Sequence, residues 1–224
     1  MFTFSFAPIG DEALLIQFHH NHHEKMIPII HFFTEKMTDI LSGKIAEVVP
    51  GFETIAVYYN PLFYSYQEMI SLIKPILESK TNIEKKMQKV IELPVCYDPP
   101  FGLDIEEVSQ LHEISIHKLV SMHSTPTYSI AFMGFLPGFP YLTGLHERLY
   151  TPRKSTPRTS VPRGAIGIGG SFTGIYPFSS PGGWNIIGQT PISIFNRNQD
   201  NPFFLQPGDL IRFYPITSNE FGGS

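Results

Sequence analysis

The sequence has little cysteine and no long apolar stretch. Its 224 residues include one cysteine, Cys96, so no disulfide can form within the chain, and we expect a cytoplasmic protein. No run of about 18 apolar residues is present, which predicts that no segment spans a membrane. The N-terminal segment MFTFSFAPIGDEALL has neither a basic region nor a long apolar core, and it predicts no signal peptide.

Charge is also scarce, and several nucleotide-binding and hydrolase motifs are missing. The formal net charge of −4 argues against general binding of nucleic acid, which needs a basic surface. The sequence contains no GxxxxGK[ST] phosphate loop and no GxSxG nucleophile turn. Gly167-Ile168-Gly169-Gly170 resembles the start of a dinucleotide fingerprint, but Phe172 stands where the next glycine is required. We therefore predict no cofactor of that type.

Four histidines lie close together at His19, His20, His22 and His23. Alternate positions at a strand end rarely converge on one transition metal without a carboxylate or cysteine partner. The cluster is interpreted as a solvated loop before a helix, and no metal site is predicted.

The first 94 residues alternate between β-rich runs and helical patterns. Met26, Ile30, Phe33, Met37 and Leu41 recur at steps of three and four residues, which indicates one face of a helix. A second helix is predicted after a capping serine, Ser65. The predicted strands are Thr3–Phe6, Ala13–Phe18, Ile45–Val49, Thr54–Tyr59 and Lys89–Val95. We interpret residues 1–94 as an α+β domain of the β-α-β-β-α-β, ferredoxin-like arrangement.

Residues 95–224 have a different pattern. Two short helices are expected at Asp104–Leu111 and Ser115–His123, each beginning at a capping residue. They resemble a helix-turn-helix by spacing, but residues 98–123 carry an excess of four acidic charges, which favours a helical hairpin over a DNA reader. Short β-rich runs then alternate with turns, which predicts a β-barrel. These runs are Tyr128–Phe132, Gly164–Ile168, Ile186–Ile187, Ile192–Phe195 and Leu210–Phe213.

The segment from Gly134 to Pro191 is the most distinctive part of the chain. It holds 19 of the 38 glycine and proline residues, five of the 16 basic residues and only one acid, Glu147. Glycine and proline allow or fix backbone conformations that other residues do not. Basic side chains on such a backbone predict a site for a small anion, either a carboxylate or a phosphate.

Arg153 and Arg158 each end a Thr-Pro-Arg triplet, five residues apart. Proline restricts the backbone before each guanidinium, which reduces the entropy lost on binding. We predict that both arginines bind an anion. The alternative is a structural role, in which they bond carbonyl groups at the end of the barrel.

Two further candidates lie on either side of these triplets. Ser180, Pro181, Gly182, Gly183 and Trp184 predict a turn whose free amides form an oxyanion nest, or else a tight turn held by the packed indole. His123 ends the second short helix, where the helix dipole favours a protonated imidazole. It is predicted either to transfer a proton or to cap the helix.

Longer motifs in the same region resemble the KipI/PxpB family, whose members are also labelled as the B component of 5-oxoprolinase or as allophanate hydrolase subunit 1. The motifs are Phe135-Leu136-Pro137-Gly138-Phe139-Pro140-Tyr141-Leu142, Pro152-Arg153, Pro157-Arg158, Val161-Pro162, Ile175-Tyr176-Pro177 and Ser180-Pro181-Gly182-Gly183-Trp184. Val95-Cys96-Tyr97, Phe101-Gly102-x-Asp104, His123-x4-Tyr128 and Pro207-Gly208-Asp209 also match. The resemblance extends from Gly10 to Pro215. Arg163 departs from it, because a small residue is expected there.

The resemblance implies a cyclophilin-like barrel after the N-terminal domain. It also implies an enzyme subunit that opens 5-oxoproline to L-glutamate with ATP, and Mg²⁺ with it, in company with a KipA/PxpC-type and a PxpA-type subunit. His123, Arg153 and Arg158 are then the expected catalytic residues. Phe135, Gly138, Tyr141 and the Ser180–Trp184 segment are expected to bind the small anionic substrate. The alternative is a regulatory protein that inhibits a sensor histidine kinase.

Overall fold

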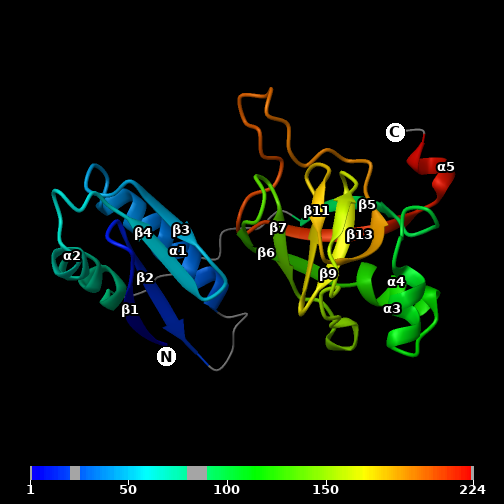
Figure 1. The fold of residues 1–224 in the computed structure, drawn as a ribbon, viewed down its shortest axis with the longest axis horizontal. Coiled ribbons are helices and arrows are strands. Elements are labelled where there is room, and N and C mark those ends of the chain that lie inside the picture. The colour runs from blue at the N-terminus through cyan, green and yellow to red at the C-terminus, as the bar shows by residue number, and fades with distance from the viewer. Residues whose placement is uncertain (1, 21–25, 80–89, 223–224) are drawn as a thin grey trace. The chain divides into compact units, whose positions relative to one another are not determined.

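The computed structural model describes residues 2–20, 26–79 and 90–222. The chain divides into two compact units, Met1–Met87 and Gln88–Ser224. Figure 1 shows the helices and strands of each unit. Two of the four clustered histidines, His22 and His23, lie outside the described residues.

The N-terminal unit is a four-stranded sheet with two helices. Its elements are β1 (Thr3–Ile9), β2 (Ala13–His19), α1 (Met26–Ile40), β3 (Glu47–Pro50), β4 (Thr54–Tyr58) and α2 (Tyr66–Glu78). The strands lie in the order β1-β2-β4-β3, and every neighbouring pair is antiparallel. Tight turns therefore suffice to join β1 to β2 and β3 to β4.

The helical pattern of the sequence identifies the core of this unit. All five residues of the predicted apolar face, from Met26 to Leu41, are buried. They pack with the inward-facing residues of β2 and β4, such as Leu14 and Val57, which are paired across the two strands. Ser65 caps α2 as predicted, because its hydroxyl accepts the N–H of Glu68 while the Glu68 carboxylate accepts the N–H of Ser65.

The ferredoxin-like arrangement is not confirmed. The described order in the N-terminal unit is β-β-α-β-β-α, and the strand predicted to complete it, β5 (Val90–Cys96), belongs to the barrel. There β5 pairs in parallel with β13 (Leu210–Ile216) and buries Leu93 and Val95 in the barrel core. Alternating apolar residues predict a strand but do not say which sheet it joins, so the assignment to residues 1–94 was wrong for β5.

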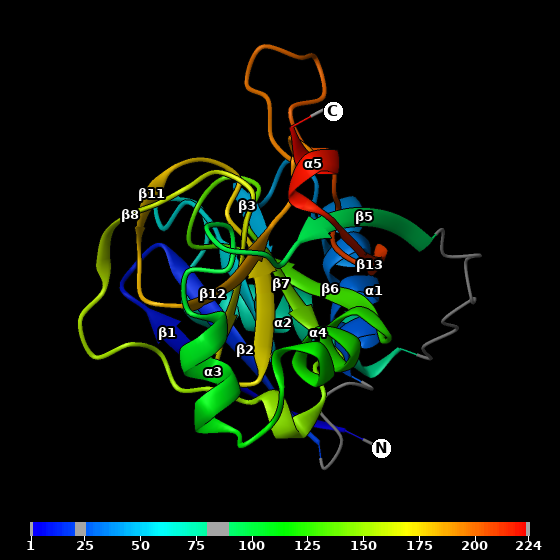
Figure 2. The ribbon, with the colours of Figure 1, turned by 90° about the vertical axis from the view of Figure 1, so that its right-hand side faces the viewer.

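The C-terminal unit is a closed seven-stranded barrel, which fits the expected cyclophilin-like fold. The strand order is β10-β7-β6-β13-β5-β12-β9, and a separate ribbon pairs β11 with β8. Figure 2 shows this ribbon beside the barrel strands. The remaining strands are β6 (Thr127–Met133), β7 (Pro140–Thr143), β8 (Arg158–Val161), β9 (Ala165–Gly169), β10 (Phe172–Ile175), β11 (Ser180–Gly182) and β12 (Asn185–Gln189).

Sequence patterns missed four of these strands and misplaced one. β7, β8, β10 and β11 are only three or four residues long, and most of them contain glycine or proline, so propensity alone does not reveal them. The Pro181–Gly183 segment, predicted as a turn, begins within β11. Ile192–Phe195 is not a strand. It starts an arm in which Phe195 and Phe203 form an isolated antiparallel bridge.

In the described part of this unit, three α-helices accompany the barrel: α3 (Ile105–Leu111), α4 (Ile116–Ser124) and a short α5 (Ser218–Phe221). Ser115 caps α4 by accepting the N–H of Lys118. Asp104 stands at the N-terminal position of α3, but its side chain forms no capping bond. That carboxylate is directed to other partners, which define the candidate site.

Candidate functional site

Asp104 is the centre of a compact ionic cluster. Its carboxylate accepts hydrogen bonds from both terminal nitrogens of Arg158. Nη1 donates to Oδ2 at 2.8 Å, and Nη2 donates to Oδ1 at 2.5 Å. Oδ1 also accepts Lys154 Nζ at 2.9 Å, and Oδ2 accepts the N–H of Ile186 at 2.7 Å. Lys154 Nζ reaches a second carboxylate, Glu107 Oε2, at 2.7 Å. The cluster thus joins the start of α3 to β8, to β12 and to the loop between η2 (Glu147–Leu149) and β8.

The electrostatics of the cluster keep the Asp104 carboxylate ionised. Burial raises its pKa, because the side chain is only 2% exposed. Hydrogen bonds from Arg158, the Ile186 N–H and Lys154 lower the pKa further than burial raises it, so it lies below its ordinary value. The Glu107 hydrogen bond, in turn, contributes most to a raised pKa of Lys154. Asp104 and Lys154 therefore both carry their charges at neutral pH.

Arg153 lies beside an aromatic cluster. Its guanidinium carbon is 5.8 Å from the centre of the Trp184 ring, a cation–π distance. Phe139 and Tyr141 meet the same indole edge to face, with ring centres 5.3 and 5.5 Å away. Within the described residues, Arg153 forms no ion pair, so its charge is not neutralised by a carboxylate.

The hydroxyl of Tyr176 is influenced by the charges of both arginines. Burial raises its pKa, while a hydrogen bond from the Trp184 backbone N–H and the charges of Arg153 and Arg158 act in the opposite direction. Both guanidinium groups therefore act on one phenol, although Tyr176 itself is buried. Arg153 and Arg158 thus both lie within electrostatic reach of this hydroxyl.

Glycine is required where the indole packs on the barrel. A Cβ on Gly169 would lie 2.5 to 2.6 Å from three atoms of the Trp184 ring. Gly182 meets the Tyr176 hydroxyl just as closely. Any larger residue at either position would displace the ring that lies beside the arginines. The Gly/Pro-rich composition of this segment therefore serves close packing as well as turns.

The predicted oxyanion nest is not formed. Ser180–Gly182 is an extended strand paired with β8, and neither Gly182 nor Gly183 has a positive φ. A nest needs successive amides in a turn conformation, which an extended strand does not provide. The Gly183 carbonyl instead accepts the N–H of Lys154 at 2.7 Å, and Pro181 is exposed. The segment fixes the loop that carries Lys154.

The residues of the Phe135–Tyr141 motif differ in their surroundings. Phe135 is 60% exposed, has a φ of 66° and meets the buried Phe139 ring edge to face. Gly138 has a φ of 80° and packs against the side chain of Phe195. Tyr141 lies in β7, half-buried between Phe132 and Trp184. Tyr141 and Phe135 thus border the aromatic cluster, while Gly138 forms its connection to the 193–204 arm.

His123 lies in the barrel interior and does not carry the charge that its place in the helix suggested. It is fully buried, and burial lowers its pKa to about 3, so the imidazole is neutral. Tyr97 Oη lies 2.8 Å from Nδ1, and Thr173 Oγ1 lies 3.0 Å from Nε2. Because the Thr173 hydroxyl donates to the Gly167 carbonyl, Nε2 must carry the proton.

The remaining contacts of His123 explain one of the sequence motifs. Its ring stacks on Phe213, and its carbonyl accepts the Tyr128 hydroxyl at 2.6 Å. The His123-x4-Tyr128 pattern therefore marks a hydrogen bond inside the barrel. These partners of His123 are interior groups, and neither Arg153 nor Arg158 is among them.

Sequence reasoning missed Asp104, Lys154 and Tyr176 as site residues. Asp104 and Tyr176 stand in two of the family motifs, Phe101-Gly102-x-Asp104 and Ile175-Tyr176-Pro177, so a signal was present. Aspartate before a helix is usually a cap, and that interpretation concealed the ion pair. Arg158 bonds this carboxylate rather than barrel-end carbonyls, which corrects the structural alternative considered for it.

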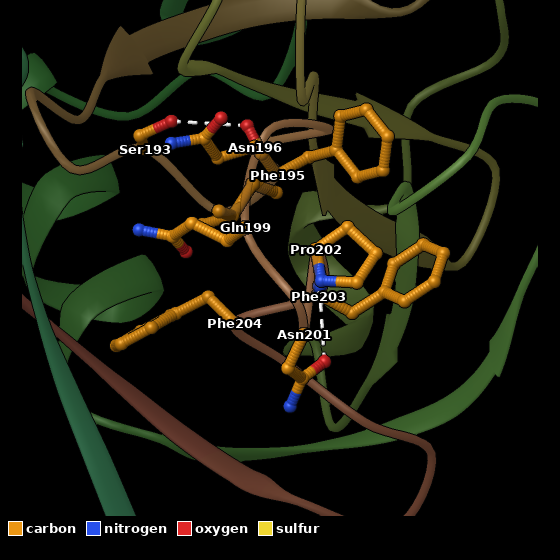
Figure 3. Close-up of a pocket in the computed structure, with 9 residues that line it drawn as sticks. Ser193, Phe195, Asn196, Gln199, Asn201, Pro202, Phe203 and Phe204 are labelled. Carbon is orange, nitrogen blue, oxygen red and sulfur yellow. Dashed lines mark hydrogen bonds between the residues drawn. The ribbon is translucent and has the colours of Figure 1, made fainter.

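An open cavity of about 340 Å³ lies in the arm formed by residues 193–204, and none of the predicted site residues lines it. Figure 3 shows the rings of Phe195 and Phe203 on one side of the arm, and Gln199 and Phe204 on the other. Across the described ranges, no group of three histidine, cysteine or acidic side chains is placed to hold a metal. In the same ranges, no helix combines the length and hydropathy needed to cross a membrane.

Comparison with known proteins agrees with this architecture. Residues 4–205 match the family described as carboxyltransferase domain, subdomain C and D. Two proteins named as the B component of 5-oxoprolinase are similar. The one from Bacillus subtilis is 32% identical over 95% of this chain and 93% of its own, and the one from Haemophilus influenzae is 42% identical over 75% and 78%. The chain therefore belongs to the carboxyltransferase subdomain C and D family, within its KipI/PxpB group.

The solved structure of TTHA0988 is similar in fold as well as in sequence. It has a TM-score of 0.78 and 30% identity over 92% of this chain. The present chain spans only 40% of the length of that protein.

Proposed function

We propose that this chain is the B component of an ATP-dependent 5-oxoprolinase. The observation that carries the proposal is the 32% identity to the Bacillus subtilis protein of that name, extending over 95% of this chain and 93% of the relative. Similarity over nearly the whole of both chains supports a shared role for the entire polypeptide. The regulatory alternative, inhibition of a sensor histidine kinase, stays a prediction.

Opening of 5-oxoproline requires a site that binds a small carboxylic acid. 5-Oxoproline is a cyclic amide with one carboxylate, and resonance makes its ring carbonyl a poor electrophile. Transfer of the ATP γ-phosphoryl group to the carbonyl oxygen makes the ring carbon open to attack by water. Cleavage of the C–N bond then leaves the γ-acyl phosphate of glutamate, and a second water displaces phosphate from it to give L-glutamate. A positively charged site beside a flat aromatic surface suits such a ring.

In this proposal, Arg153 binds the substrate carboxylate. Its guanidinium stands beside Trp184 and is not paired with an acid in the described part of the chain. Arg158, which is 27% exposed, keeps three of its five N–H donors outside the pair with Asp104 and supplies a second contact. His123 takes no part, because its proton is held inside the barrel.

The residues that the structure describes do not fit a complete site for ATP and Mg²⁺. The two acids near the arginines, Asp104 and Glu107, already bind cations of the protein itself, and the sequence lacks a phosphate loop. We therefore assign the binding of ATP and Mg²⁺ to a partner subunit of the KipA/PxpC type, with a PxpA-type subunit as the third component. The extra length of TTHA0988 beyond the region shared with this chain supports a need for further polypeptide.

Reconstitution tests the proposal directly. The purified chain is mixed with its two partner subunits, ATP and 5-oxoproline, and glutamate formation is measured. We expect glutamate only when all three subunits and ATP are present. Absence of glutamate, with partners that are active alongside a known B component, rules the proposal out.

Arg153→Ala tests the assigned residue. Because a hydrogen bond to a charged group contributes about 1.5–3 kcal/mol, we expect KM for 5-oxoproline to rise roughly 10- to 100-fold. Arg197→Ala removes an exposed arginine from the 193–204 arm and is the matched control. Equal kinetic constants for the two variants would remove Arg153 from the site.

A further inference from the structure

We propose that Asp104 is a positioning residue: it fixes the guanidinium of Arg158 so that the remaining N–H groups face the substrate. The proposal rests on the function assigned above to the arginine site. It concerns a residue that does not itself contact the substrate. Its carboxylate is buried, while the arginine that it holds is partly exposed.

The first step of the argument is the geometry of the pair. Nη1 and Nη2 of Arg158 bond different oxygens of the same carboxylate, at 2.8 and 2.5 Å. Two parallel bonds prevent rotation about the Nε–Cζ axis, whereas a single bond would allow it. The guanidinium plane is thereby fixed, and the three N–H groups that do not face Asp104 have defined directions.

The second step is that the carboxylate is itself immobile. Asp104 Oδ2 accepts the N–H of Ile186, and the N–H of Asp104 donates to the Ile186 carbonyl, both at 2.7 Å. A Cβ on Gly102 would lie 2.8 Å from the Ile187 carbonyl, so the approach to β12 leaves no free space. The position of Arg158 is therefore set by a barrel strand through Asp104.

The third step concerns the loop on which the arginines lie. Lys154 binds Asp104 and Glu107 through its side chain and the Gly183 carbonyl through its backbone. The Pro152 carbonyl accepts Asn185 Nδ2 at 2.8 Å. Arg153 thus lies between two residues whose backbones are held by the segment at the start of β12. Asp104 contributes to placing both arginines, directly for Arg158 and through Lys154 for Arg153.

The first experiment needs neither the partner subunits nor activity. Nitrogen-15 NMR of the arginine side chains reports whether each guanidinium rotates. We expect separate, slowly exchanging Nη signals for Arg158 and averaged signals for Arg197. Asp104→Asn should average the Arg158 signals, whereas Glu92→Gln should not. Glu92 is the matched control, because its carboxylate pairs with Arg212 on the neighbouring barrel strand and has no bond to the site. Averaged Arg158 signals in the unchanged protein would overturn the proposal.

The second experiment separates positioning from a merely structural role. In the three-subunit assay, Asp104→Asn should raise KM for 5-oxoproline by roughly tenfold, the size expected for one charge-assisted contact. In the Arg158→Ala background the same substitution should change KM by less than about twofold, since the group it acts through is gone. A tenfold effect in both backgrounds would show that Asp104 acts otherwise and would overturn the proposal.

The two experiments also distinguish this proposal from the proposed function. Failure of the wild-type complex to form glutamate defeats the function but leaves the NMR result on Arg158 intact. If Asp104→Asn does not fold, as judged by Trp184 fluorescence, the NMR signals of the unchanged protein still decide the matter.

Discussion

In the N-terminal unit, the buried residues among those described are apolar, with the Tyr59 hydroxyl as the one polar group. Among its described residues, the barrel unit buries eight polar or charged side chains besides its tyrosines and Trp184, and these include Asp104, His123, Thr173 and Asn185. No described histidine of the N-terminal unit is buried. The two units thus achieve a closed interior in different ways, one by apolar packing and the other by packing combined with hydrogen-bond networks.

This difference shows which unit places polar side chains in fixed positions. An apolar core tolerates exchange of similar residues, because only volume and shape must be kept. A buried polar network requires particular donors and acceptors, since an unpaired polar atom in the interior is costly. In the barrel, within the described residues, no buried side-chain nitrogen or oxygen lacks a partner. Its networks therefore fix positions, which is what the arginine site needs.

The strongest test of the comparison is a cavity in the N-terminal core. Phe33 is fully buried and stacks against Phe18 with ring centres 6.2 Å apart. Phe33→Ala should lower the free energy of unfolding of this unit by about 3–5 kcal/mol. Urea unfolding followed by circular dichroism measures the effect, and Phe33→Leu, which keeps most of the volume, is the control.

Trp184, the single tryptophan, reports on the barrel alone in the same experiment. Its fluorescence transition should remain where it is in the unchanged protein. A shift of both transitions by the same amount would show that the units unfold together, and the comparison between them would fail.

A second test uses the buried imidazole of His123. Its pKa is about 3 in the folded barrel and near 6.5 in an unfolded chain. Between these values the unfolded state binds a proton that the folded state does not, so stability falls as the pH falls from 6.5 towards 3. The slope from this group is at most about 1.4 kcal/mol per pH unit, and above pH 6.5 the group contributes none.

Urea unfolding of the barrel, followed by Trp184 fluorescence at several pH values, measures this slope. His123→Gln keeps a polar side chain at the position but cannot be protonated. We expect a shallower pH dependence in the variant over the same window. Identical slopes for the two proteins would show that His123 is not the group responsible.

The smallest expected effect concerns the cap of α2. Ser65→Ala removes the hydroxyl that accepts the Glu68 N–H and should cost about 1 kcal/mol of stability in the N-terminal unit. Ser65→Asp restores an acceptor and is the control. Urea unfolding followed by circular dichroism should show the change, with the Trp184 fluorescence transition unaltered. A loss of unfolding free energy larger than that of Phe33→Ala would contradict the expected ranking of the two substitutions.

Most elements of the N-terminal unit could be predicted from sequence, because its core depends on local apolar patterns. The residues from Met26 to Leu41 form the buried helical face, and the two hairpins are present, because local periodicity determines both. The error lay in β5, whose partner β13 is more than 100 residues away in the chain. Local patterns carry no information about such a distant pairing.

The candidate site was predicted in part. The Thr-Pro-Arg triplets led to Arg153 and Arg158, which share a region. The same reasoning missed Asp104 and expected a charged imidazole at His123, because burial is decided by tertiary packing rather than by place in a helix. The supposed nest at Gly182 and Gly183 failed because glycine at position 182 suits close packing against Tyr176 as well as it suits a turn.

The parallel pairing of β5 with β13 has a consequence for synthesis of the chain. Residues 90–96 find their partner only when residues 210–216 have been made. The barrel cannot close before residues 210–216 have been made, whereas the sheet of the N-terminal unit, complete by residue 58, can form long before. During this interval β5 exposes an unpaired edge and the apolar side chains of Leu93 and Val95. The growing chain is then most exposed to misassembly, and the C-terminal strand is the element that ends this exposure.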